Sequence, residues 1–377
     1  MSESTREEHL AQILSTNRID NIDNIRLPLR VLLPKVAAHA AAVIIALWLF
    51  ILALQLIKEG ADGLRPVLDA VSVDGIAGHF GFGWFGAYVV LSGSPVAAVA
   101  MSLFAGGAVS DLDAFSIING TRMGASLIVL VVGFVSYATG RRNPDGLYIG
   151  VVALLTSITL WGPAMPLGLL VLDQGWLNGA HVSSPGALTS FVGAISDPVV
   201  EPLLDALPRL LLFVAGIGAL VLGFALFDRS LPSLERPGTR FEALSQALQQ
   251  RYAMFGFGVL VTLLTLSVSL SVTILVPLAL KGYVRRDRVV PYVMGANIAT
   301  WVDTLLAALL LDSPTGFEIV LTQMLAGSVI SLVVLVFLYR PYTRLILGTA
   351  HKVSSSRRSL VIFLAALVLA PLAFLAV

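Results

Sequence analysis

Long apolar stretches set the strongest limit on how this 377-residue chain can fold. An α-helix needs about 20 apolar residues to cross the hydrocarbon layer of a bilayer. Seven stretches are long enough, and they cover residues 36–57, 114–139, 147–172, 207–227, 289–311, 319–339 and 359–377. The chain is 57% hydrophobic and only 12% charged. We therefore expect an all-α polytopic membrane protein.

The charges and the lack of cysteine exclude several classes of protein. A formal net charge of +1 gives no basis for binding nucleic acid. Without cysteine there are no disulfides, no thiolate metal sites and no cysteine nucleophile. The five histidines lack the spacing of metal ligands, and no nucleophile stands with a base. We expect neither an enzyme nor a bound cofactor.

One phrase of the sequence occurs twice, 175 residues apart (255 − 80). FGFGWFGAYVVLSGS begins at Phe80, and FGFGVLVTLLTLSVS begins at Phe255. The copies share the FGFG motif, a Leu-Ser-x-Ser motif and later glycines, which indicates a duplicated unit. Each phrase runs into a further apolar stretch, at residues 84–107 and 259–282.

The positions of the positive charges indicate that these two stretches turn back within the membrane. With hairpins and an inner N-terminus, only Lys58 and Arg65 of the 24 Lys and Arg residues fall in outer segments. Full crossings would move Arg141, Arg142 and the arginines of residues 228–257 outside, against the positive-inside rule. We therefore expect two re-entrant hairpins, a cytoplasmic N-terminus and location in the cell membrane.

The expected organisation is two repeats of opposite topology followed by one extra helix. Each repeat has a transmembrane helix, a re-entrant hairpin and two more transmembrane helices. Three crossings are an odd number, so the second copy is upside down, as in many secondary transporters. The expected segments are a cytoplasmic arm (1–35), repeat 1 (36–172), an external loop (173–206), repeat 2 (207–340), and a cytoplasmic loop with a C-terminal transmembrane helix (341–377).

The motifs of the two copies carry a resemblance to a known family. Residues 91–94 read LSGS, residues 266–269 read LSVS, and residues 295–300 read GANIAT. The chain resembles the type II sodium-dependent phosphate symporters, whose repeats each carry a QSSS hairpin motif followed by GANIGT. Here leucine replaces both glutamines, and Arg122 stands at the Asn position of the first copy. The resemblance implies inverted repeats, inorganic phosphate as substrate and Na⁺ as coupling ion.

The polar residues of these motifs form the candidate site. A hydroxyl can donate to an anion and accept toward a hard cation without burying a charge. We assign to the substrate Ser92, Ser94, Arg122, Ser267, Ser269 and Asn297. We assign to the coupling ion Ser271, Thr273, Thr300 and Asp303. The competing interpretation is that small polar residues only allow helices to pack closely or bond to the preceding turn.

Arg122 and Asp303 are the charged residues deepest in the predicted spans. Ions inside a membrane are costly and usually face an interior cavity with a partner. Our hypothesis is that Arg122 binds the anion or replaces a cation site with a fixed charge, and that Asp303 pairs with it or binds Na⁺ or H⁺. The alternative is that Arg122 extends outward to the interface and Asp303 bonds nearby backbone.

The function expected from the sequence is cation-coupled symport of phosphate or a related small anion. A passive anion channel and a non-transporting sensor or scaffold with the same fold are the alternatives. The expected partners are the small anion, Na⁺ or H⁺, and the lipid bilayer, with no nucleic acid. A homodimer is compatible with the sequence.

Overall fold

The computed structural model of this chain consists of helices joined by turns. It describes residues 29–64, 66, 73–136, 145–177, 179–180, 182–230, 250–280 and 284–376. Within these ranges there is no strand, and eight helical segments are long and apolar enough to cross a membrane. The chain is therefore a multi-pass membrane protein, as predicted. Most of the predicted N-terminal arm lies outside the described residues, and helix begins at Leu29, before the expected boundary at residue 35.

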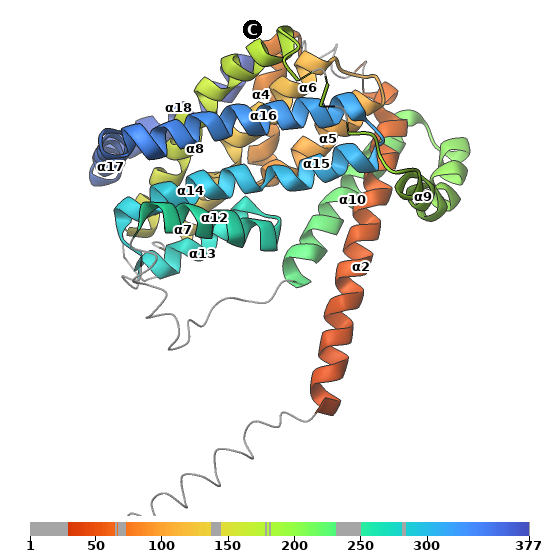
Figure 1. Ribbon diagram of the computed structural model, residues 1–377, viewed down its shortest axis with the longest axis horizontal. Coiled ribbons are helices and arrows are strands. Elements are labelled where there is room, and N and C mark those ends of the chain that lie inside the picture. Colours follow the sequence, from red (N-terminus) through yellow and green to blue (C-terminus); the bar gives the residue numbers. More distant parts are fainter. Residues whose placement is uncertain are drawn as a thin grey trace, which may run out of the picture.

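The helices follow the order of the apolar stretches (Figure 1). They are α2 (Leu29–Gly60), η2 (Ala61–Gly63), α4 (Gly75–Val90), α5 (Gly93–Ala105), α6 (Asp111–Ala125), α7 (Leu127–Ser136), α8 (Asp145–Asp173), α9 (Gly186–Ala206), α10 (Arg209–Ser230), α12 (Arg251–Thr265), α13 (Val268–Leu280), α14 (Arg286–Ala299), α15 (Trp301–Leu310), α16 (Pro314–Val333), the π-helical segment η4 (Val334–Leu338), α17 (Tyr339–Ser355) and α18 (Arg357–Leu375). Seven of the eight candidate spans overlap the seven predicted stretches.

Helix α9 is the eighth candidate span, and it occupies much of the segment predicted as an external loop, residues 173–206. Its mean hydropathy of 1.2 is the lowest of the eight. Pro198 and Pro202 lie inside it. Prolines and acidic residues favour a loop when the sequence is considered alone, yet proline is tolerated within membrane helices because neighbouring groups satisfy the freed backbone.

Helices α2 and α10 pack together as one pair. In Figure 1 they run down the picture, whereas α14, α15 and α16 run across it. Glycines bring the two backbones close: a Cβ on Gly60 would lie 2.4 Å from the Phe213 nitrogen, and one on Gly63 would lie 2.3 Å from the Leu210 nitrogen. Small residues allow such close helix contact in membrane proteins.

The two duplicated phrases each form a pair of short helices joined by a tight turn. Leu91 and Ser92 join α4 to α5, and Leu266 and Ser267 join α12 to α13. The φ angles of Leu91 and Leu266 are 55° and 47°. This left-handed backbone is uncommon for a residue other than glycine. The same uncommon backbone conformation thus occurs at the corresponding leucine of both phrases.

The helix pairs begin earlier than the predicted hairpin boundaries of 84–107 and 259–282. Helix α4 begins at Gly75 and α12 begins at Arg251. The FGFG motif therefore lies inside the first helix of each pair rather than at its start. Apolar density alone could not locate these boundaries, because the helices begin in sequence of mixed polarity.

The FGFG helices pack against the following long helices in the same way in both copies. Helix α4 packs on α6, and α12 packs on α14. A Cβ on Gly120 would lie 2.1 Å from the Phe80 carbonyl oxygen, and a Cβ on Gly295 would lie 2.1 Å from the Phe255 carbonyl oxygen. Both contacts join positions that are equivalent in the sequence repeat, so the shared glycines are explained by backbone contact.

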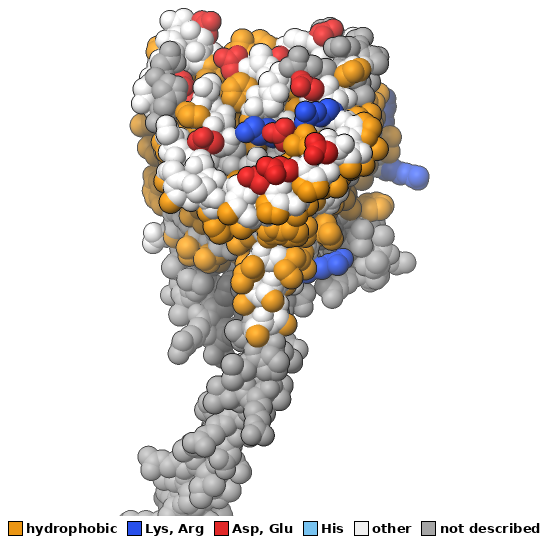
Figure 2. Space-filling model, turned by 90° about the vertical axis from the view of Figure 1, so that its right-hand side faces the viewer, with side chains coloured by type: hydrophobic (Ala, Val, Ile, Leu, Met, Phe, Trp, Pro, Cys, Tyr) orange, Lys and Arg blue, Asp and Glu red, His pale blue; other side chains and the backbone are white. Residues whose placement is uncertain are grey.

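The outer surface and the two ends of the helix bundle differ in character. Large apolar side chains such as Phe337, which is 77% exposed, lie on the outside, where acyl chains contact a membrane protein. Figure 2 shows acidic side chains gathered at the end that lies to the right in Figure 1. The opposite end carries α17 and the start of α14, with Arg285, Arg286 and Arg340.

Candidate functional site

The turns of the two helix pairs lie at one cavity of about 150 Å³. Its lining residues are Val90, Ser92, Ser94, Pro95, Val221, Phe224, Ala225, Leu266 and Ser267. A cavity needs only about 10–15 Å³ to hold a water molecule, so this one has room for several waters or a small ion. Three of the predicted substrate residues, Ser92, Ser94 and Ser267, thus come together from both copies.

The three hydroxyl groups have different surroundings. Ser92 precedes the first turn of α5 in extended backbone, and its side chain makes no capping hydrogen bond. The Ser92 hydroxyl therefore does not bind the N–H groups at the start of α5. Ser94 Oγ lies 3.4 Å from Thr300 Oγ1, at the bend between α14 and α15. Ser267 Oγ accepts from the Leu270 N–H at 3.2 Å and caps α13.

Arg122 is buried next to Gly93 in the first turn, although it is not among the residues that line this cavity. Its side chain is 1% exposed, so the predicted alternative of an outward extension to the interface is wrong. The Arg122 Nε donates to Thr121 Oγ1 at 3.2 Å, and Cζ lies 4.4 Å from the ring centroid of Trp301. Nη2 has no hydrogen-bond partner. A guanidinium stacked on indole is stabilised by cation–π attraction, most strongly where water is excluded.

The free end of Arg122 reaches the backbone between the two lining serines. A Cβ on Gly93 would lie 2.7 Å from Nη2, so glycine at this position leaves the space that the guanidinium fills. At the equivalent positions of the second copy stand Val268 and Asn297. The first copy thus combines the long Arg122 side chain with a glycine in the turn, and the second copy combines the shorter Asn297 with a valine.

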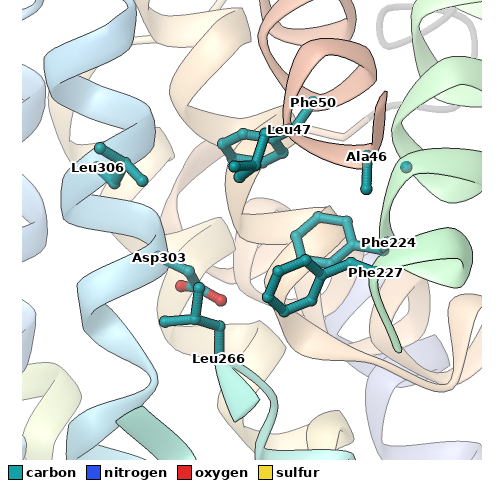
Figure 3. A pocket seen from close by; sticks show the side chains of 9 residues that line it. Ala46, Leu47, Phe50, Phe224, Phe227, Leu266, Asp303 and Leu306 are labelled. Atoms are coloured by element: carbon teal, nitrogen blue, oxygen red, sulfur yellow. The ribbon is translucent and has the colours of Figure 1, made fainter. Parts of the chain in front are cut away.

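Asp303 lines a second, smaller cavity of about 40 Å³ (Figure 3). The other lining residues are Ala46, Leu47, Phe50, Gly223, Phe224, Phe227, Leu266 and Leu306. Phe224 and Leu266 belong to both cavities, so the two are neighbours. Asp303 is 6% exposed; Oδ1 accepts from Thr304 Oγ1 at 2.8 Å, and Oδ2 has no hydrogen-bond partner. The Asp303 carboxylate therefore has one oxygen, Oδ2, without a hydrogen-bond partner, and most side chains around the cavity are apolar.

Arg122 and Asp303 attract each other through their charges but are not in direct contact. Each charge acts on the other, and the Ser94 hydroxyl lies near the carboxylate as well. No ion pair within 4.0 Å joins Arg122 and Asp303. The predicted direct pairing of the two side chains is therefore absent, and their opposite charges flank the hydroxyl groups.

Asn297 lies in a buried hydrogen-bond network separate from the cavity lining. Its Nδ2 donates to Ser157 Oγ at 2.9 Å, and Ser157 Oγ lies 2.7 Å from Ser126 Oγ. The Asn297 Oδ1 has no partner, and the residue is 1% exposed. Asn297 is not among the residues that line either cavity, although it was predicted to contact the substrate.

The remaining predicted site residues lie on α13 and are not brought to the cavity by the described contacts. Ser271 is fully buried; its Oγ accepts from Thr262 Oγ1 and bonds the Tyr292 hydroxyl, each at 2.8 Å. These bonds join α12, α13 and α14, so Ser271 fits the packing interpretation. Thr273 is half-buried on α13. The side chain of Ser269 lies outside the described part of the structure.

Sequence reasoning missed several residues of this site. Trp301 supports Arg122 and packs edge-to-face with Trp161 at 5.5 Å between ring centroids. Helix α10 contributes Phe224 to both cavities, although its sequence between the charged ends is apolar and carries no motif. The one usable signal was a tryptophan directly after the GANIAT motif.

Comparison with known protein families, curated proteins and solved structures finds no match for this chain. Among the described residues, no group of three or more His, Asp or Glu side chains is placed to hold a metal ion.

Proposed function

We propose that this protein is a secondary active transporter that moves a small anion by alternating access, coupled to a cation gradient. Inorganic phosphate is the substrate implied by the resemblance to the type II sodium-dependent phosphate symporters. One observation carries the proposal: Ser92, Ser94 and Ser267, from equivalent turns far apart in sequence, line the same cavity. Packing alone gives no reason for both hydroxyl motifs to meet at an unfilled space.

The charge beside the cavity favours an anion as substrate. Arg122 is buried, always protonated, and has a free Nη2 at Gly93, between the two serines of the first turn. Burying a guanidinium costs several kcal/mol, on the order of 2.5–3.5 by insertion scales. The N-terminus of α5, which Ser92 leaves without a side-chain cap, adds partial positive charge. An anion bound here would satisfy these donors together.

Three observations support the inverted repeat that alternating access requires. The left-handed turn residues and the glycine contacts of the FGFG helices recur at equivalent positions of the two copies, and α2 packs against α10, the corresponding helix of the second copy. The acidic end and the arginine-rich end of the bundle agree with the topology that the positive-inside rule gives for re-entrant hairpins. Two such hairpins would reach one site from opposite sides of the membrane.

Asp303, with Ser94 and Thr300 near it, is the proposed binding group for the coupling cation. Its free Oδ2 can take a proton directly. Na⁺ would need further oxygen ligands, which these two hydroxyls and backbone carbonyls at the α14–α15 bend would supply. Na⁺ is the ion implied by the resemblance, and H⁺ is the alternative that the apolar lining of the smaller cavity favours.

Uptake of radiolabelled phosphate into proteoliposomes tests the function. We expect accumulation above equilibrium under an inward gradient of Na⁺ or H⁺. Downhill flux alone would identify a passive anion channel, which a fixed Arg122 would also suit. Absence of flux for phosphate and related small anions would favour a non-transporting sensor or scaffold.

A pair of serine variants tests whether the cavity is the transport site. Replacing Ser92 and Ser94 together by Ala removes two donors and should raise the KM for phosphate at least about tenfold, because hydrogen bonds to charged groups contribute about 1.5–3 kcal/mol each. Ser102→Ala is the matched control: Ser102 lies on the same helix, is fully buried and has no hydrogen-bond partner. Equal effects of both substitutions would place the anion elsewhere.

A further inference from the structure

A third cavity, open to the surface, lies at the arginine-rich end of the bundle. It has a volume of about 530 Å³ and is lined by Arg285, Arg286, Asp287, Tyr339, Arg340, Thr343, Arg344 and Leu347. These residues come from the start of α14 and from α17, and none of them belongs to the cavity at the hairpin turns. Four arginines therefore converge where neither the duplicated motifs nor the proposed transport site needs them.

Within the described part of the chain, two of the lining arginines, Arg340 and Arg344, have no acidic partner. Asp287 is the one acidic lining residue, and its Oδ1 accepts from the Arg285 Nε at 3.1 Å. Arg288 takes the other oxygen at 3.5 Å. Arg340 and Arg344 form no ion pair with any described residue and lie four residues apart on α17. Like charges at this spacing repel each other, so an anion from outside the chain would stabilise the helix.

Helix α17 has the position of an interfacial helix. In Figure 1 it is seen nearly end-on at the left, whereas α16 runs across the picture and ends there. The segment η4 joins it to α16. It buries one face, including Tyr339, Thr343 and Ile346, and exposes Arg340 and Arg344. A helix with an apolar face that crosses the ends of two spanning helices lies at the depth of the lipid headgroups.

Apolar residues beside these arginines indicate the rest of the ligand. Phe337 is 77% exposed just before Arg340, and Leu345 is 63% exposed just after Arg344. A free inorganic anion would gain nothing from such neighbours. An acyl chain would cover them while the arginines hold a phosphate, which guanidinium groups bind in bidentate fashion.

We propose that this cavity binds the headgroup of an anionic phospholipid, with its phosphodiester held by Arg340 and Arg344 and an acyl chain against Phe337 and Leu345. Basic pockets between transmembrane helices bind such headgroups in other membrane proteins. This site is separate from the transport cavity, so the proposal stands whether or not the protein carries phosphate.

Native mass spectrometry of the purified full-length protein tests the proposal, with phosphatidylglycerol titrated against phosphatidylcholine. We expect preferential binding of phosphatidylglycerol. Combining Arg340→Gln with Arg344→Gln should weaken that binding by about 30-fold, the effect of losing two cations at a membrane surface. Combining Arg340→Lys with Arg344→Lys keeps the charge and should give a smaller loss, because lysine cannot bind the phosphate in bidentate fashion.

The matched control combines Arg357→Gln with Arg358→Gln. Both residues are exposed at the start of α18, carry the same charge and are not among the residues that line the cavity. This control should retain nearly full affinity for phosphatidylglycerol. Equal losses in the two glutamine pairs, or no loss in the Arg340 and Arg344 pair, would overturn the proposal. Displacement of the lipid by millimolar inorganic phosphate would also overturn it, since the site would then recognise free phosphate.

Discussion

Arg122→Gln separates the functional role of the buried guanidinium from a structural one. The amide of glutamine reaches about as far as the Arg122 Nε and can still bond Thr121, but it removes the charge and the contact with Trp301 at 4.4 Å. The lost cation–π attraction is worth about 2 kcal/mol where water is excluded. Relief of the cost of burying the ion offsets it by a similar amount. We therefore expect little change in the stability of the protein.

The effect of the same substitution on substrate binding should be large. A charge-assisted hydrogen bond to an anion contributes about 1.5–3 kcal/mol, which corresponds to a loss of affinity of about 10- to 150-fold. The KM for phosphate uptake in proteoliposomes and the Kd from calorimetry in detergent measure this loss. Arg122→Lys should give an intermediate value, because it keeps the charge but not the planar stacking.

Arg209→Gln provides the control for Arg122→Gln. Arg209 is the other arginine of the predicted spans, its side chain is 51% exposed, and it pairs with Glu59 at 3.4 Å, away from both cavities. This control should leave the KM unchanged. An unchanged KM in Arg122→Gln would refute the anion-binding role of Arg122. A fall in melting temperature with unchanged transport would show instead that Arg122 only supports packing.

Three further predictions concern packing and topology. Gly295→Ala should destabilise the protein by about 2 kcal/mol, since its Cβ would lie 2.1 Å from a carbonyl oxygen, whereas Gly348→Ala, with open space around it, should not lower the melting temperature. Ser157→Ala leaves the amide of its buried partner unpaired and should cost about 1–3 kcal/mol in denaturant or thermal unfolding. Single cysteines at Asp111 and Arg285 should react with an impermeant thiol reagent from outside only at the former; labelling of both from one side would contradict the predicted topology.

The sequence was sufficient to predict the helical class and seven of the eight candidate spans. Long apolar runs have few structural alternatives in a membrane, which explains this success. Helix α9 escaped detection because its prolines and acidic residues resemble a loop. The starts of α4 and α12 were also misplaced, since apolar density does not locate the first turn of a helix.

The site was predicted in part for a different reason. The paired motifs identified Ser92, Ser94 and Ser267, because the repeat marks which positions are equivalent. The side of a short helix that faces a cavity depends on how the helix is rotated against its neighbours. No sequence pattern predicted this rotation for α13, and Ser271 bonds Tyr292 instead of lining the cavity. The contribution of Phe224 depends on the packing of α10 and could not be predicted.

The convergence of the two turns can be measured directly in this cysteine-free chain. Ser94→Cys combined with Ser267→Cys places two thiols at one cavity. A short bifunctional thiol reagent should link them within one molecule, detected after cleavage at a protease site inserted between the copies, and each single variant should give no link. Failure of the double variant to link, while both thiols react singly, would show that the hairpin turns do not share a site.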